Sequence, residues 1–207
     1  MSEEGKSVEV ALVTATNTQI SAQMTEQNSM LDQATVWVKS GLLPSSVKTP
    51  EQAVVIALKG KELNLTPMAS FELIDVIMGK PALKPKGMAG MVRKGGVRYK
   101  TVKDFEPVFD AEGKKVDMET IIRFYRDGLE EDVKYTYRDA QALGLTSKDN
   151  WKKQPGIMMY WRCFSKGANR VCPDLIGGLY TTEELASFTA NAPTIQLTED
   201  GESVVIG

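Results

Sequence analysis

The feature that most constrains the fold is a series of three strand-like runs in the middle of the chain, each bounded by turn residues. The runs are rich in β-branched and aromatic residues, and Gly-containing polar segments of a few residues separate them. Short separations of this kind favour antiparallel hairpins, so the pattern predicts a three-stranded antiparallel sheet. The predicted strands are Val97–Phe105, Thr120–Arg126 and Asp132–Tyr137, with turns at Asp110–Lys114 and Asp127–Gly128.

A single long helix is predicted after these strands, from about Pro155 to Val171, where Pro173 ends it. One face of this helix is apolar and must be buried. The apolar face comprises Ile157, Trp161, Phe164, Ala168 and Val171. A small antiparallel sheet and a hairpin packed by helices give the fold class α+β.

The clearest helix start is Thr49-Pro50-Glu51-Gln52. Thr49 is a favourable N-cap, proline suits the first helical position, and Gln52 stands three residues after the cap, which is a capping box. Other predicted elements are helices over Asn28–Lys39, Met68–Ile74, Gly87–Lys94 and Asp139–Leu143, a hairpin over Val76–Leu83 that turns at Gly79-Lys80, and a short helix starting at Thr181.

The chain is predicted to have one core domain over residues 28–187. Residues 1–27 are polar and predicted to be flexible, and the acidic tail over residues 188–207 is predicted to be disordered. Hydrophobic residues make up 42% of the chain, which is enough to bury a sizeable core.

Several functional classes lack their usual residues. The chain has no histidine, so the commonest general base and metal ligand are missing, and its two cysteines, Cys163 and Cys172, cannot build a zinc site. No phosphate-binding loop motif occurs, and we expect no cofactor. Two free thiols, the lack of a signal-peptide pattern and the lack of a long apolar run predict a cytoplasmic protein without a membrane anchor.

Charge is strongly segregated along a chain whose net charge is only −2. Val76–Lys103 holds eight basic residues and no acidic one, and Lys148–Arg170 holds six basic residues against one acidic. Between them, Asp104–Asp132 holds ten acidic and four basic residues. Segregation of this kind builds a positive face, which indicates a polyanionic partner.

Periodicity places some of these cations together. Arg162, Lys166 and Arg170 fall at i, i+4 and i+8 and are predicted to line one face of the long helix. Arg98 and Lys100 alternate along a strand and are predicted to share one face of the sheet. The plainer interpretation is that each basic run is a solvated surface, and that Trp151 packs in the core instead of stacking on a base.

Two blocks of sequence are similar to the RecT family of phage recombinases. The first is Lys48-Thr49-Pro50-Glu51-Gln52-Ala53 with Ile56–Leu63, Pro67-Met68, Phe71 and the hairpin Val76–Pro81. The second is Lys148–Pro155, then Met158, Arg162 and Arg170, then Pro173–Leu185. The resemblance covers about residues 42–187.

The resemblance to the RecT and lambda Bet type implies single-stranded DNA binding and annealing of complementary strands without ATP, in phage-type recombination in a bacterial host cell. It implies a homo-oligomer, as a ring or a helical filament. It also implies a partner exonuclease or host single-strand binding protein. Family members often bind that partner through a C-terminal module, and here a short acidic tail stands in its place. The resemblance also implies a basic DNA-binding groove. The predicted DNA-binding residues are Lys80, Lys84, Lys86, Arg93, Lys94, Arg98, Lys100, Trp151, Lys152, Lys153, Arg162, Lys166 and Arg170.

Two other functions stay open at this point. One is a protein–protein adaptor whose basic face meets an acidic partner. The other is a metal-dependent enzyme acting on nucleic acid, for which Asp127, Glu130, Glu131 and Asp132 are near enough in sequence to bind Mg²⁺.

Overall fold

The computed structural model of the chain describes residues 28–77, 79–182, 184–185, 194–197 and 203–206. The predicted flexible segment 1–27 lies outside them, as does most of the predicted acidic tail. The chain forms two compact units, with the boundary between Glu72 and Leu73. A single core over residues 28–187 was expected, and each unit is described separately below.

The first unit is helical. It contains a helix over residues 28–39, then α2 (Pro50–Glu62) and most of α3 (Pro67–Leu73). The predicted capping box is confirmed, since the Thr49 hydroxyl accepts from the Gln52 N–H and the Gln52 side chain accepts from the Thr49 N–H, both at 3.3 Å. Trp37 and Phe71 meet edge to face at 5.5 Å within this unit.

The second unit begins with a hairpin of β1 (Ile74–Ile77) and β2 (Lys80–Leu83), which pair from Ile74–Leu83 to Ile77–Lys80. Lys80 therefore belongs to the second strand, whereas the sequence placed it in the turn. Helix α4 (Pro85–Lys94) follows and ends at Gly95-Gly96, where Gly96 has a φ of 82°. The second strand of the hairpin contacts a later segment of the chain, since the Leu83 N–H donates to the Tyr180 carbonyl at 2.9 Å.

The predicted three-stranded antiparallel sheet is confirmed, with the strand order β3-β4-β5. Strand β3 spans Arg98–Phe109, β4 spans Lys115–Arg126 and β5 spans Leu129–Thr136. The β4–β5 turn lies at Asp127-Gly128, with φ values of 51° and 80° that suit a tight hairpin. The first two strands are longer than the sequence indicated, whereas the third starts earlier and ends one residue sooner.

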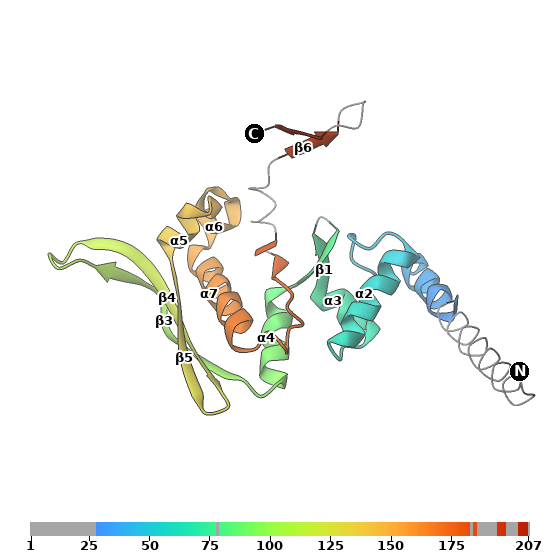
Figure 1. The fold of residues 1–207 in the computed structure, drawn as a ribbon, viewed down its shortest axis with the longest axis horizontal. Helices are drawn as coiled ribbons and strands as arrows, with labels where there is room; N and C mark the ends of the chain where they lie inside the picture. The colour runs from blue at the N-terminus through green and yellow to red at the C-terminus, as the bar shows by residue number, and fades with distance from the viewer. Residues whose placement is uncertain (1–27, 78, 183, 186–193, 198–202, 207) are drawn as a thin grey trace, which may run out of the picture. The chain divides into compact units, whose positions relative to one another are not determined.

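Short helices connect the sheet to the predicted long helix. These are α5 (Tyr137–Ala142), a 3-10 turn (Leu145–Ser147) and α6 (Asp149–Lys153), followed by α7 (Pro155–Val171). Figure 1 shows α7 lying along one side of the sheet, with α4 beyond it. We call the side of the sheet that packs on α7 the helix face and the opposite side the outer face.

The buried side of α7 differs from the predicted one. Phe164 and Ala168 are buried as expected, but Ile157 is 52% exposed, and Trp161 and Val171 are only half-buried. Met159 and Cys163 are fully buried instead, and the Cys163 thiol donates to the Val133 carbonyl of β5 at 3.1 Å. The apolar face is therefore rotated from the one that the largest residues suggested.

Gly167 explains how closely α7 approaches the sheet. A Cβ at this position would lie 2.1 Å from a ring carbon of Phe124, which is itself fully buried. A better helix former would force Phe124 or the helix to move, so glycine at this position is required by packing.

Near the C-terminus, residues 184–185 are helical and Thr181 forms a capping interaction with Glu184, in which the Glu184 N–H donates to the Thr181 hydroxyl at 3.3 Å. This agrees with the predicted helix start. Strands β6 (Thr194–Leu197) and β7 (Ser203–Ile206) pair antiparallel within the segment that was predicted to be disordered. Within the described ranges, no helix is both long and apolar enough to cross a lipid bilayer.

Candidate nucleic-acid interface

The first basic segment runs through three consecutive elements of the second unit. We define the basic run as seven cations that continue from the hairpin through α4 into β3. Its members are exposed or half-exposed, and they are Lys80, Lys84, Lys86, Arg93, Lys94, Arg98 and Lys100. None of them lies within 4 Å of a carboxylate of the residues that the structure describes.

Helix α4 presents part of the basic run on one side. Lys86, Gly90 and Arg93 fall at i, i+4 and i+7, and all three are exposed. A Cβ added at Gly90 would meet no atom within 4 Å, so no side chain covers the helix backbone at this point. A glycine between two cations lets a ligand backbone approach the helix closely.

The N-terminus of α4 adds to the positive potential. Its N-cap residue, Lys84, makes no side-chain capping bond, and the first turn contains no acidic residue. The free N–H groups of a helix N-terminus attract anions, and here they lie beside Lys84 and Lys86.

Arg93 is held in place at the other end of α4. Its Nε donates to the Tyr99 hydroxyl at 3.0 Å, and its guanidinium lies 4.9 Å from the centroid of the Tyr99 ring. Tyr99 in turn packs against Phe164 of α7 at 4.8 Å. Tyr99 is thus a half-buried residue that packs on α7 and positions an exposed arginine.

The outer face of the sheet carries two rows of polar residues. Strand pairing places Arg98, Tyr125 and Glu130 in one row. The neighbouring row is Lys100, Arg123 and Asp132. The prediction that Arg98 and Lys100 share a face of the sheet is therefore confirmed.

Tyr125 lies between the two exposed cations of β3. The Arg98 guanidinium is 5.8 Å and the Lys100 ammonium 6.0 Å from the centroid of its ring. We did not identify Tyr125 from the sequence, although strand alternation places it opposite the buried Phe124 and so on the outer face. A half-exposed aromatic ring flanked by cations is a feature of surfaces that bind single-stranded nucleic acid.

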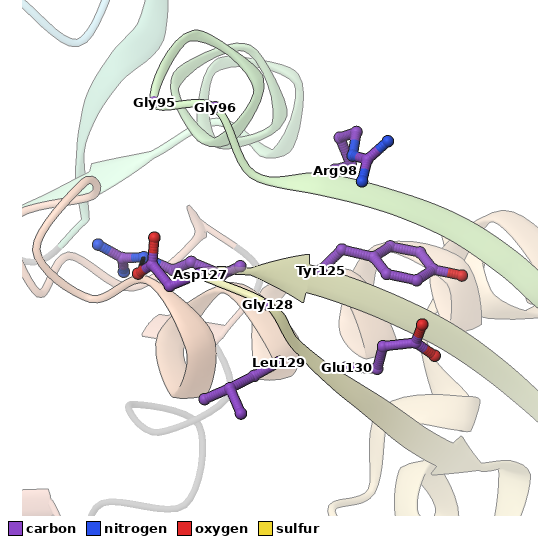
Figure 2. A pocket seen from close by; sticks show the side chains of 9 residues that line it. Gly95, Gly96, Arg98, Tyr125, Asp127, Gly128, Leu129 and Glu130 are labelled. Atoms are coloured by element: carbon purple, nitrogen blue, oxygen red, sulfur yellow. Dashed lines mark ion pairs between the residues drawn. The ribbon is translucent and has the colours of Figure 1, made fainter.

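A polar pocket of about 350 Å³ opens at the end of this face. Figure 2 shows Gly95 and Gly96 at the end of α4 on one side and the turn at Gly128 on the other, with Arg98 and Tyr125 on neighbouring strands. A Cβ added at Gly96 would meet no atom within 4 Å, whereas one at Gly95 would meet the Leu175 side chain.

Charge on the outer face changes sign from β3 to β5. Arg123 on the central strand forms a two-pronged ion pair with Asp132, with Nε–Oδ1 at 2.6 Å and Nη2–Oδ2 at 2.7 Å. These hydrogen bonds lower the pKa of the Asp132 carboxyl. Glu130 and Asp132 on β5 lie in the same rows as Arg98 and Lys100 on β3, so in these two rows the cations of the basic run lie on the β3 side.

The second basic segment is different, and two of its predicted contacts are corrected. Trp151 is 1% exposed, so its ring packs in the core and offers no face to a base. Arg162 is 6% exposed and lines a small cavity with Trp151 and Met158, so it is not part of an exposed stripe. Both residues lie on the side of α6 and α7 that packs into the unit.

Most of the other cations of this segment form a hydrogen bond or an ion pair with a neighbouring residue. Lys166 donates to the Lys134 carbonyl of β5 at 3.0 Å, and Arg170 pairs with Glu131 at 2.5 Å. Lys153 pairs with Asp149 at 3.2 Å, whereas Lys152 is exposed without such a partner among the described residues. The helix stripe predicted from i, i+4 spacing therefore faces β5.

The predicted residues do not all meet in one groove. Arg98 and Lys100 lie on the outer face, whereas Arg93 reaches Tyr99, whose ring points to the helix face. The basic run is therefore continuous along the sequence but lies on both sides of β3, and the α6–α7 cations contribute little to it.

The carboxylates considered for a metal site are separated. Glu131 pairs with Arg170 of α7, whereas Asp132 pairs with Arg123 on the outer face. Across the described residues, no group of three or more Asp, Glu or Cys side chains is arranged to hold a metal ion. The geometry therefore does not favour the metal-dependent alternative.

Comparison of the chain with protein-family models, with curated proteins and with solved structures gives no match.

Proposed function

We propose that this protein binds single-stranded DNA through the basic run and anneals complementary strands without nucleotide or metal. The observation that supports this proposal is the set of seven exposed or half-exposed cations between Lys80 and Lys100, none paired with a carboxylate among the described residues. Lys103, the next cation, pairs with Glu119 at 2.6 Å and marks the end of the run.

The physical basis is neutralisation of phosphate charge. Two complementary strands repel each other, and cations that bind the phosphates of one strand reduce this repulsion for the other. Contacts to phosphates are independent of sequence, so Watson–Crick pairing between the strands supplies the selectivity. The protein needs no reactive side chain for this role.

The resemblance to RecT-type proteins motivates the rest of the proposal. Assembly into a homo-oligomer, a role in phage-type recombination and a partner exonuclease or single-strand binding protein follow from it as proposals. Lys80, the first cation of the basic run, lies in the hairpin Val76–Pro81 at the end of the first similar block.

A direct test is to mix two complementary oligonucleotides, one with a donor and one with an acceptor dye, and to follow duplex formation in the presence of a chelator and without ATP. We expect the protein to speed annealing, with a strong dependence on salt. The adaptor alternative predicts no acceleration and no preference for single-stranded DNA, and this result would exclude annealing.

A further inference from the structure

The half-exposed ring of Tyr125 belongs to the most firmly held strand of the sheet. Strand β4 is central, and the Tyr125 backbone pairs with Arg98 on one side and with Glu130 on the other. The preceding residue, Phe124, is fully buried, and its ring lies 5.6 Å from that of Phe164 in α7. A side chain on such a strand loses little conformational freedom when a ligand binds to it.

The pocket of about 350 Å³ that Tyr125 lines has a defined shape, and its volume is within the range of ligand-binding pockets. Arg126, another lining residue, donates to the two carboxylate oxygens of Asp174 at 2.6 and 2.7 Å, and to the Val171 carbonyl at 2.8 Å. These hydrogen bonds tie the end of β4 to the end of α7. The wall of the pocket is therefore formed before any ligand binds.

Two glycines give a ligand access to the backbone in this pocket. Gly96 follows α4 with a φ of 82°, and Gly128 lies in the β4–β5 turn with a φ of 80°. A Cβ added at either position would meet no atom within 4 Å. No side chain fills the space beside Tyr125 from these two positions, so a flat group can enter there.

The cations beside the ring are available to an anion. Neither Arg98 nor Lys100 has a carboxylate within 4 Å among the residues that the structure describes. Their charged groups lie 5.8 and 6.0 Å from the centroid of the Tyr125 ring, which is the outer limit of a cation–π contact. A ligand can therefore displace them from the ring at small cost. Figure 2 shows Tyr125 between Arg98 and Glu130, with the cation on the β3 side.

The ring, the cations and the pocket correspond to the parts of one nucleotide. A nucleobase is flat and stacks on an aromatic ring, and its phosphate lies one sugar away, where a cation can bind it. In a duplex, neighbouring base pairs cover both faces of a base, so only an unstacked base can present its face to a protein ring. Phosphates are exposed in both forms of DNA. A contact to the face of a base therefore distinguishes a single strand from a duplex.

We propose that Tyr125 stacks on a nucleobase of the bound single strand, that this base occupies the pocket beside Gly96 and Gly128, and that Arg98 and Lys100 hold the adjoining phosphates. This inference rests on the proposed function and deepens it, because it assigns the preference for single strands to one side chain. Every base has a face that can stack, so the contact leaves annealing independent of sequence.

The first test compares two oligonucleotides that have the same phosphates but differ in their bases. A thymidine oligonucleotide and an abasic strand of the same length are titrated with the protein, and fluorescence anisotropy gives each Kd. We expect the abasic strand to bind about 10-fold more weakly, which is the order expected for one base–aromatic stack. Tyr125→Leu, which keeps an apolar side chain without an aromatic face, is expected to lose most of this difference, and Tyr125→Phe to retain it.

Phe109→Leu is the matched control, since Phe109 is an aromatic residue that is 58% exposed at the far end of β3. An equal loss in Phe109→Leu and Tyr125→Leu would overturn the proposal, as would an abasic strand that binds the unaltered protein as tightly as the thymidine strand. The slope of log K against log salt should be the same for Tyr125→Leu and the unaltered protein, because stacking neutralises no phosphate. A lower slope in Tyr125→Leu would mean that phosphate contacts are lost instead of a stack.

The second test locates the base directly. An oligonucleotide that carries 5-iodouracil in place of thymine forms a covalent link to an aromatic side chain against its base when it is irradiated. We expect mass spectrometry to find the link at Tyr125, and Tyr125→Leu to lose this product. Absence of the product from the unaltered protein, or linkage mainly to Phe109 or to Tyr180, which is 47% exposed, would place the base elsewhere.

Duplex DNA and a free nucleotide test the class of ligand. Tyr125→Leu is expected to leave the Kd for duplex unchanged and to lower the preference for single strands about 10-fold; an equal loss for both forms would contradict the proposal. Thymidine monophosphate is expected not to displace the oligonucleotide at the same concentration of nucleotide, because it lacks the neighbouring phosphates. Displacement would show that the pocket serves a free nucleotide and not a strand.

The two proposals fail in different ways. If the unaltered protein binds neither oligonucleotide, the proposed function fails and the role of Tyr125 fails with it. If the protein binds the thymidine and abasic strands equally and still anneals complementary DNA, the proposed function stands and only the stacking contact is lost.

Discussion

The basic run and the α6–α7 cations look alike in sequence but differ in their surroundings. Both segments are rich in Lys and Arg and poor in acidic residues. In the structure, the basic run stays exposed or half-exposed without carboxylate partners among the described residues, whereas Arg162 is buried and Arg170 pairs with Glu131. The difference arises because α7 packs on the sheet and β5 supplies its partners. Local charge density therefore does not identify an interface unless the neighbouring elements are known.

The largest effect is expected from removing four cations of the basic run together. Replacing Lys86, Arg93, Lys94 and Lys100 with alanine should raise the Kd for single-stranded DNA about 100-fold at low salt. The slope of log K against log salt should fall by about 3, because each phosphate contact on a single strand contributes about 0.7. Fluorescence anisotropy over a range of salt concentrations measures both quantities.

The matched control removes four cations from the other segment: Lys152, Lys153, Lys166 and Arg170. This variant has the same net charge as the first, so a general effect of charge is held constant. A loss of affinity equal to or greater than that of the first variant would reverse the comparison.

Arg162 is expected to matter for stability and not for binding. Arg162→Ala should lower the free energy of unfolding by about 2–3 kcal/mol, because it removes a large side chain that is 94% buried by area. Urea denaturation measures the loss. The salt slope for DNA binding should remain unchanged under conditions where the variant is folded, and a lower slope would return Arg162 to the interface.

The buried side of α7 also predicts a pH dependence. Burial raises the pKa of the Cys163 thiol from 9.0 to about 12. Between these values the unfolded chain loses the proton while the folded protein keeps it, so the free energy of unfolding falls as pH rises from about 9 to 12. Urea denaturation at a series of pH values is expected to show this fall, and Cys163→Ala is expected to reduce its steepness.

The smallest effect is expected from Arg170→Gln. Its ion pair with Glu131 is partly exposed, with side-chain exposures of 60% and 36%, so the free energy of unfolding should change by less than about 1 kcal/mol. DNA affinity should change little as well. A large loss of affinity from this single substitution would show that Arg170 leaves Glu131 to contact the DNA.

Local patterns predicted the local features of the fold well. The capping box at Thr49, the tight turn at Asp127-Gly128 and the common face of Arg98 and Lys100 depend on residues close in sequence, and all three are confirmed. The orientation of α7 was predicted less well, because its burial is set by the contact between Gly167 and Phe124, which are 43 positions apart. No periodicity within the helix reports that contact.

The candidate interface could be predicted only in part for the same reason. The absence of acidic residues between Val76 and Lys103 is visible in the sequence and corresponds to cations without carboxylate partners in the described residues. The ion pair of Arg170 depends on Glu131, which lies on strand β5 and not on the helix that carries Arg170. Tyr125 required the register of β3 against β4, which brings Arg98 and Lys100 to its ring.

The change of sign across the outer face has a consequence for any polyanion that approaches it. Arg98 and Lys100 attract phosphates at the β3 rim, whereas Arg123 on the central strand is paired with Asp132 and Glu130 and is less available to a phosphate. A nucleic-acid strand that binds this surface is therefore expected to lie nearer β3 than the central strand. An uneven distribution of unpaired cations would favour one lateral position of a bound strand without any contact to a base.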